Sequence, residues 1–290
     1  MWTLLQIELF KIFKRPRTYI AFVAISDIVI LIQLALYLDG KTYVNFMLQS
    51  IERFNVEGKI LNGYFACYLI LQTLLIHVPL LIALVGGDMI AGEANMGTLR
   101  LLISKPINRS TLLISKFLAS TIYTLLLLVW MAVFSLLISL IIFGPGDLMV
   151  FQSQVIIQIP RSDVFWRYVA AFGFAAIAMT TVAALSFFLS LFAENSIGPI
   201  VAAMSIVIVC TILTTMDLPL FVSMKPYLFT SHMLGWKGFF DIRASADGSA
   251  EIGSIQNLPA IMKSALILIG HIVGFVGAAI IIFRKKDILS

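Results

Sequence analysis

Asp27 is an acidic residue deep within a long apolar run of this sequence. An ionised carboxyl group in hydrocarbon is costly, so such residues mark a functional path or a contact with other protein. We expect Asp27 either to face a substrate path at a subunit interface or to hold two helices together by a hydrogen bond, and both roles stay open. Gln33 follows about two helical turns later. His77 lies in the next apolar run, where it can line a path or make a helix-packing hydrogen bond.

No catalytic motif accompanies these residues. The three histidines, His77, His232 and His271, lie in different regions without the short spacings of metal sites. The sequence contains no G-x-x-x-x-G-K-[ST], G-x-S-x-G or H-E-x-x-H pattern. We therefore expect no catalytic residues, no metal and no cofactor in this chain, so that any Mg-ATP binds a partner protein. The alternative is an intramembrane enzyme that uses Asp27 and His77.

Residues 87–111 form a polar island between two apolar runs, with the pattern of a short helix that transmits force. Gly97 allows a tight backbone turn, Thr98 can cap the helix, and Lys105-Pro106 can end it. Its leucine and isoleucine side chains would then be presented to the cleft of a partner. The candidate coupling residues are Glu93, Gly97, Thr98, Leu99, Arg100, Leu102, Ile103, Pro106 and Arg109. We expect Glu93 to pair with Arg100 or Arg109.

Composition predicts an integral membrane protein. Of the 290 residues, 60% are hydrophobic and 12% are charged, whereas about 25% of the residues of a soluble domain are charged. The mean hydropathy is +1.02. The net charge of +5 is spread over the ends of the apolar runs rather than gathered in one patch, so we expect no nucleic-acid partner.

Six apolar stretches have the roughly 20 residues that a membrane-spanning helix needs. They are residues 18–38, 64–86, 112–143, 164–192, 197–216 and 264–283. Six spans place both termini on one side. The segments on that side carry 11 basic and 5 acidic residues, whereas the other side carries 9 of each. This asymmetry predicts that both termini are cytoplasmic.

Two further segments are predicted to be short helices. Residues 1–17 read as an amphipathic helix in the inner headgroup layer, with Trp2 on its apolar face and its lysines near anionic lipid. Pro16 should end this helix near Arg15. In the outer loop 217–263, the side chains at positions 229, 233, 236 and 240 form one helical stripe. An aromatic belt at the membrane surface explains most of that stripe.

The pattern Glu93-x-x-x-Gly97-Thr98-Leu99-x-x-Leu102-x-Ser104-x-Pro106, followed by Arg109 and Lys116, resembles the cytoplasmic loop of type-2 ABC transporter permeases. In that family the loop carries a coupling helix that docks on a separate ATPase subunit. Many relatives have a basic residue two positions after the glutamate, whereas Ala94-Asn95 stands here, which puts an ion-pair network in doubt. The resemblance covers about thirty residues and is supported by six spans along the whole chain.

This resemblance implies an all-α integral membrane protein that forms a single permease domain, residues 1–290. The implied elements are an N-terminal interfacial helix, six spans, a cytoplasmic coupling helix and short outer helices between spans five and six. The implied partners are cytoplasmic ABC ATPase subunits, a second permease copy or a paralogue, and membrane lipid. The candidate pathway residues, between the first, second and fifth spans, are Asp27, Gln33, Gln72, His77, Thr211 and Thr214.

The expected function is that of the membrane subunit of an ATP-driven exporter in a bacterial or archaeal plasma (inner) membrane. Its cargo would be amphipathic, lipid-linked or peptide-like. A second alternative is a scaffold subunit of an envelope complex that keeps the ATPase coupling but moves no cargo. Coupling to an ATPase separates the exporter from the intramembrane enzyme, and movement of cargo separates it from the scaffold.

Overall fold

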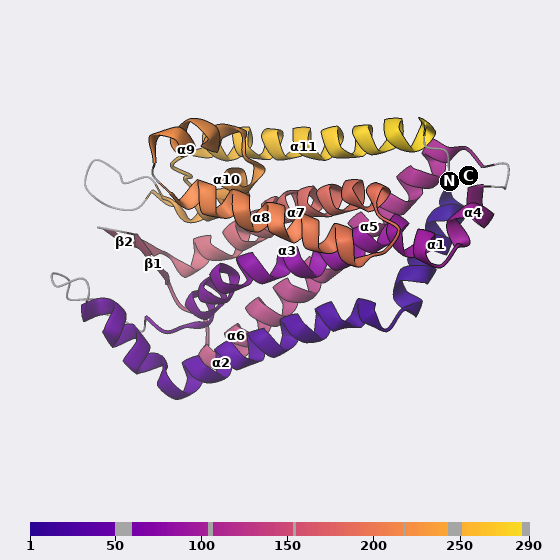
Figure 1. Cartoon of the computed structure of the whole chain (residues 1–290). Helices are drawn as coiled ribbons and strands as arrows, with labels where there is room; N and C mark the ends of the chain where they lie inside the picture. Colours follow the sequence, from indigo (N-terminus) through magenta and orange to yellow (C-terminus); the bar gives the residue numbers. More distant parts are fainter. Residues whose placement is uncertain (50–59, 104–106, 153–154, 217, 243–250, 286–290) are drawn as a thin grey trace.

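The computed structural model describes residues 1–49, 60–103, 107–152, 155–216, 218–242 and 251–285. Long helices run side by side along one axis (Figure 1). One end of this bundle, the termini end, carries the N-terminal helix α1 (Trp2–Lys14), the short helix α4 (Thr98–Ile103) and the close of helix α11 (Leu258–Lys285). The opposite end carries a β-hairpin and is called the hairpin end.

Within the described part of the chain, six helical segments are long and apolar enough to cross a membrane. The chain is therefore a multi-pass membrane protein. Four of these segments are single helices, namely α2, α3, α8 and α11. In one of the other two segments, α5 continues through a π-helical turn (η1) into α6. In the other segment, α7 continues into a 3₁₀ turn (η2). The segments are α2 (Arg17–Gln49), α3 (Gly63–Asn95), α5–η1–α6 (Arg109–Ala132, Val133–Ile138, Ser139–Phe143), α7–η2 (Arg161–Leu189, Ser190–Phe192), α8 (Ile197–Thr215) and α11.

Each predicted span lies within one of these segments to within a residue or two, because a backbone in hydrocarbon must satisfy its own hydrogen bonds. The helices extend beyond the predicted limits where polar residues follow the apolar run. Helix α2 continues eleven residues past position 38. Helix α3 continues to Asn95, so residues 87–95 of the predicted coupling loop are helical.

The prediction of an all-α fold misses a hairpin between α6 and α7. Strands β1 (Leu148–Gln152) and β2 (Val155–Ile159) pair antiparallel, with Leu148 opposite Ile159 and Gln152 opposite Val155. Alternation of apolar and polar residues is weak here, which removes the usual signal for a strand. The hairpin lies at the end of the bundle opposite the termini (Figure 1).

Short helices between α8 and α11 also lie at the hairpin end, as predicted. They are α9 (Pro219–Met224), η3 (Lys225–Tyr227), α10 (Phe229–Met233) and η4 (Leu234–Phe240). The interpretation of their aromatic stripe as a surface belt is wrong, since Phe229, Met233, Trp236 and Phe240 are all buried. Trp236 and Phe240 pack on Tyr68 of α3. The stripe therefore fastens the short helices to the bundle.

Close helix contacts fix the centre of the bundle, where α3 packs against α7, α8 and α5. Gly63 begins α3, and a Cβ atom there would lie 2.6 Å from the Leu140 Cα and 2.7 Å from the Ser139 carbonyl oxygen. Because both of these are backbone atoms, no side-chain movement can make room.

We predict that Gly63→Ala lowers the free energy of unfolding by about 1–3 kcal/mol, the usual cost of overpacking. The matched control is Gly173→Ala on α7, where nothing lies within 4 Å of the position that the added methyl group would take. That control should leave stability unchanged or raise it by up to about 1 kcal/mol, since alanine favours the helix. Thermal unfolding of both variants in the same detergent checks the prediction, and an equal response of the two would contradict it.

Candidate functional site

A sharp turn at the termini end separates α3 from α4. Gly97 has a φ of +69°, in the left-handed region that glycine adopts without strain. Its backbone N–H donates to the Ala94 carbonyl oxygen at 3.0 Å. The Thr98 hydroxyl donates to the Glu93 carbonyl oxygen at 3.3 Å, so it closes the end of α3 as α4 begins. The predicted tight turn at Gly97 is confirmed. Thr98, predicted to cap α4, is instead the first residue of that helix, and its hydroxyl bonds to the end of α3.

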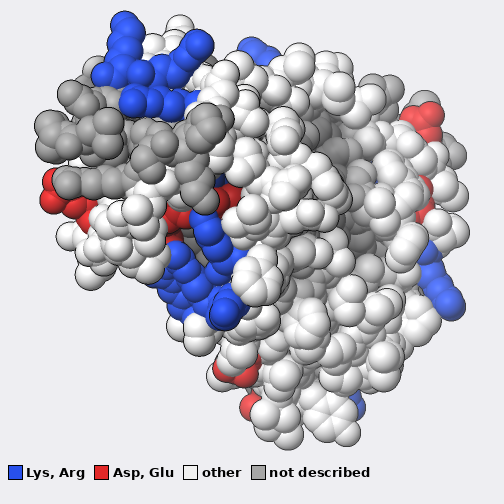
Figure 2. All heavy atoms as spheres, turned by 90° about the vertical axis from the view of Figure 1, so that its right-hand side faces the viewer, with Lys and Arg blue, Asp and Glu red and all other residues white. Residues whose placement is uncertain are grey.

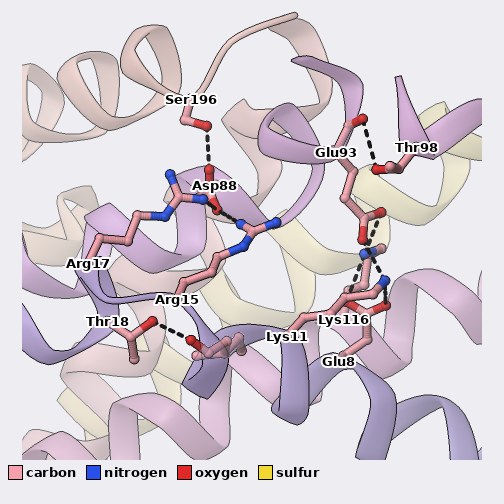
Figure 3. A network of polar contacts seen from close by, with 11 residues as sticks. Glu8, Lys11, Arg15, Arg17, Thr18, Asp88, Glu93, Thr98, Lys116 and Ser196 are labelled. Carbon is pink, nitrogen blue, oxygen red and sulfur yellow. Dashed lines mark hydrogen bonds and ion pairs between the residues drawn. The ribbon is translucent and has the colours of Figure 1, made fainter. Parts of the chain in front are cut away.

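Four charged side chains form a closed ionic ring behind this turn (Figure 3). Lys11 Nζ lies 2.8 Å from Glu8 Oε1 and 2.7 Å from Glu93 Oε1. Lys116 Nζ lies 2.8 Å from Glu8 Oε2 and 2.7 Å from Glu93 Oε2. Each ammonium thus bridges both carboxylates. The ring joins α1, α3 and α5.

Burial makes the ionic ring a strong constraint. Glu8, Glu93 and Lys116 are almost completely buried, and only Lys11 is partly exposed. Buried charges must stay paired, because removal of one partner leaves the other unsolvated. Burial lowers the pKa of Lys11, but its hydrogen bonds and charge contacts with Glu8 and Glu93 outweigh this, so its pKa is raised above 10.5. Lys11 is therefore a cation at neutral pH.

A second charged cluster lies one turn earlier on α3. Asp88 accepts from Arg15 and Arg17 on one carboxylate oxygen and from the Ser196 hydroxyl on the other (Figure 3). These partners come from the α1–α2 turn and from the α7–α8 turn. A Cβ atom at Gly92 would lie 2.3 Å from Asp88 Oδ1, so the absence of a side chain there leaves room for this carboxylate.

The N-terminal segment forms a helix as predicted. Arg15 has extended backbone after α1, which confirms that the helix ends before Pro16. Leu5 and Ile12 are buried against the bundle, whereas Trp2 is exposed. Lys11 and Arg15 turn inward to the two clusters. Lys11, expected near anionic lipid, is therefore held by carboxylates of its own chain.

A groove of about 320 Å³ opens between α1 and the α3–α4 turn, beside the ionic ring. It is lined by Lys11, Arg15, Glu93, Met96, Thr98, Leu101 and Leu102. Leu101 is 68% exposed and Met96 is 54% exposed. Figure 2 views the termini end and shows acidic atoms beside a group of basic side chains on this surface. The groove therefore presents exposed apolar side chains next to the paired charges of the ionic ring.

Two details of the predicted coupling residues are wrong. Glu93 pairs with Lys11 and Lys116, whereas the Arg109 guanidinium donates to the Arg284 carbonyl oxygen at 3.3 Å. Leu99 is only 7% exposed and packs in the chain's own core, so it cannot contact a partner.

Leu101 takes the outward position on α4, and Leu102 is half-buried beside the groove. The side chains of Arg100 and Ile103, and all of Pro106, lie outside the described part of the chain.

The sequence analysis missed Glu8 and Asp88 as members of the site. The signal was present, since Asp88 follows a long apolar run and Glu8 lies among the apolar residues of α1. The coupling pattern begins at Glu93 and ends at Lys116, and these two residues form an ion pair.

Three of the predicted pathway residues are exposed. Gln72 and His77 are exposed on α3, and Asp27 is exposed on α2. His77 Nδ1 lies 3.0 Å from the Thr73 carbonyl oxygen of its own helix. Polar groups on a membrane-facing surface cost free energy unless protein or water covers them.

The other predicted pathway residues make hydrogen bonds within the chain. Gln33 is buried and donates to the Ser139 hydroxyl at 2.9 Å, so it ties α2 to the π-helical turn and α6. Thr211 and Thr214 on α8 donate to carbonyl oxygens of their own helix, at Val207 and Thr211. Such bonds satisfy a hydroxyl within a single helix, so these threonines need no polar path around them.

Among the described residues, no three His, Cys, Asp or Glu side chains gather as they would around a metal ion. The charged groups of the ionic ring and of the Asp88 cluster are paired with each other, which suits them to hold elements in place.

Comparison with known proteins places the chain in a family. The family described as "Protein of unknown function (DUF2705)" matches residues 27–289. This chain belongs to that family. The DUF2705 match includes Asp88, Glu93 and Lys116 and begins after α1. The "Uncharacterized protein YhcI" of Bacillus subtilis (strain 168) is 24% identical over 211 residues, which cover 71% of this chain and 63% of that protein. The match thus spans less than two thirds of that relative's length.

Proposed function

We propose that this chain is the membrane-spanning subunit of an ATP-driven exporter of the type-2 ABC class. In this proposal separate cytoplasmic ATPase subunits dock at the termini end, and a second permease subunit faces the first across the substrate path. The membrane is the plasma membrane of a bacterium or archaeon, with both termini in the cytoplasm. The cargo is amphipathic, lipid-linked or peptide-like.

The observation that carries the proposal is the anchoring of α4. A helix that transmits force must present apolar side chains to its partner on one side. On the other side it must be fixed to the rest of the chain. Leu101 and Met96 are exposed at the groove. Behind them Glu93 belongs to the ionic ring that joins α1, α3 and α5. A push on α4 would therefore be passed to three helices together.

Movement on ATP binding follows from differential affinity. ATP changes the conformation of the transporter only if the ATPase pair binds ATP more tightly in one conformer than in the other. In this proposal the position of α4 differs between the two conformers. The groove supplies an apolar contact surface for such a partner, because Met96, Leu101 and Leu102 line it. A partner helix with apolar side chains on one face fits this surface.

Two exposed polar residues of α3 support the path. Gln72 and His77 face outward, where lipid alone would leave them poorly solvated. A second subunit opposite these residues would enclose them. Cargo with a polar headgroup and an apolar body would then meet sparse polar side chains in an otherwise apolar passage.

The test is co-purification of the tagged chain with the products of its neighbouring genes, followed by an ATPase assay. Leu101→Glu should abolish capture of the ATPase, because it places a charge in the centre of the apolar contact. The matched control is Leu220→Glu on α9, a leucine of 69% exposure at the hairpin end. That variant should retain wild-type capture.

Loss of the ATPase from both variants, or from neither, would contradict the proposed docking site. A wild-type chain that captures no ATPase would overturn the transporter proposal as a whole. If ATPase capture persists but no cargo crosses vesicle membranes, the scaffold alternative replaces the exporter.

A further inference from the structure

An apolar cavity of about 40 Å³ lies among α3, α5, α7 and the short helices α10 and η4. Phe172 and Ala175 of α7 are half-buried, whereas the other residues that line the cavity are buried. The cavity therefore opens beside these two residues. Val169, one turn before Phe172, is 58% exposed, so this side of α7 faces the surroundings of the bundle.

The cavity lies at the depth of the membrane hydrocarbon. Its lining on α3 runs from Leu71 to Val78, which spans about 10 Å of helix at about 1.5 Å per residue. The short helix η4 bounds the cavity toward the hairpin end, where Trp236 packs on Tyr68 of α3. A chain that entered here would run from η4 toward the middle of the membrane.

The size and the lining of the cavity select an apolar chain. A single water molecule needs about 10–15 Å³ by the same measure, so the cavity has room for about three groups of that size in a narrow space. No hydroxyl, amide or charged side chain lines it, and an apolar cavity of this kind does not hold water. In hydrocarbon, the group available to fill it is an acyl chain.

A cation lies at the end of the cavity nearest to η4. Lys237 follows Trp236, and its Nζ lies 5.9 Å from the centre of the Trp236 ring that lines the cavity. Lys237 is half-buried, and within the described part of the chain it takes part in no ion pair or hydrogen bond. Burial lowers the pKa of its ammonium group below 10.5. A half-buried cation of this kind is stabilised by an anion from outside the chain.

We propose that one acyl chain of a membrane phospholipid enters this cavity through the opening at Ala175, and that the phosphate group of the same lipid pairs with Lys237. The apolar cavity and the adjacent cation match the two parts of this ligand. The Trp236 ring touches both parts of the site, so a single lipid can reach them together. The site lies away from the groove at the termini end and does not depend on an ATPase.

Quenching of Trp236 fluorescence by phospholipid that is brominated along its acyl chains tests entry of the chain. The background carries Trp2→Phe, Trp130→Phe and Trp166→Phe, so that Trp236 alone fluoresces. Bromine quenches at close range, and Trp236 is only 4% exposed, so strong quenching is expected when a brominated chain occupies the cavity.

Ala175→Phe closes the opening of the cavity and should abolish most of this quenching. The matched control is Val169→Phe, which adds a ring to the same helix at a position that does not line the cavity. That control should keep the quenching of the parent chain. Ala175→Leu repeats the test with a smaller side chain if Ala175→Phe does not fold. Equal quenching in the closed and control variants, or no quenching in the parent chain, overturns the proposal.

Removal of the lysine and removal of the phosphate should have the same effect. In detergent, Lys237→Gln should raise the concentration of brominated phospholipid at half-maximal quenching about tenfold, as loss of a charge-assisted hydrogen bond does. Brominated diacylglycerol, which lacks the phosphate, should need a similar increase with the parent chain. Lys263→Gln, which removes an exposed lysine of α11, is the control and should change neither value.

The two removals should not add, because each of them breaks the same contact. Lys237→Gln should therefore leave the binding of brominated diacylglycerol unchanged. An equal loss with both lipids, or diacylglycerol that binds the parent chain as tightly as phospholipid, overturns the pairing of Lys237 with phosphate. Quenching that follows these expectations while no ATPase co-purifies supports the lipid site and rejects the transporter, so the two proposals fail separately.

Discussion

Lys116→Met should lower the free energy of unfolding by about 3–5 kcal/mol, the range for breaking a buried ion pair by removing one partner. Lys116 is 1% exposed and bridges Glu8 and Glu93, so its loss leaves two buried carboxylates with a single ammonium, that of Lys11. The excess negative charge cannot reach solvent without moving α1. Thermal unfolding in detergent measures the loss.

Two further variants identify the ionic ring as the cause. Lys263→Met removes an exposed lysine of α11 and should change stability by no more than about 0.5 kcal/mol. Adding Glu93→Gln to Lys116→Met restores the charge balance and should recover part of the stability, which a double-mutant cycle quantifies. If Lys116→Met behaves like Lys263→Met, the ring does not constrain the fold.

Arg167→Met should have a comparable effect at the hairpin end, again about 3–5 kcal/mol. Arg167 is fully buried and binds Asp163 through two nitrogens, at 3.0 and 2.6 Å. It also donates to the carbonyl oxygens of Phe239 and Ser254 at 2.6 and 2.8 Å. One side chain on α7 therefore anchors both η4 and the segment that leads to α11.

This anchoring gives a local readout besides stability. A glutamate-specific protease should cleave after Glu251 faster in Arg167→Met than in the wild type, because the neighbouring Ser254 has lost its donor. Arg161→Met, which removes an exposed arginine from the same helix, is the matched control and should leave both the cleavage rate and the unfolding temperature near wild type. Equal cleavage rates for the two variants would show that Arg167 does not hold the segment.

The sequence predicted the structure most accurately where a single physical effect decides the backbone conformation. A run of about 20 apolar residues must form a helix, because hydrocarbon offers the backbone no other hydrogen-bond partner. The turn at Gly97 was predictable for a similar reason, since glycine adopts a positive φ without steric cost.

Prediction was weaker where several partners compete. Glu93 was assigned to arginines nearby in sequence, but it binds lysines 82 and 23 positions away. Leu99 and Leu101 are both leucines on one six-residue helix, and only the packing of α4 on α3 decides which of them is buried. The hydrogen-bond partners of Gln33, which are Phe134 and Ser139, lie 101 and 106 positions away along the chain, so the sequence did not predict them.

The sequence by itself determined where the six long apolar helices of the described residues lie, because burial in hydrocarbon depends on local composition. Only the tertiary structure decided which charges meet. Glu8, Lys11, Glu93 and Lys116 come from three helices, and their pairing depends on how these helices are rotated and staggered against each other. Many arrangements bury the same apolar area, but few of them leave every buried charge with a partner.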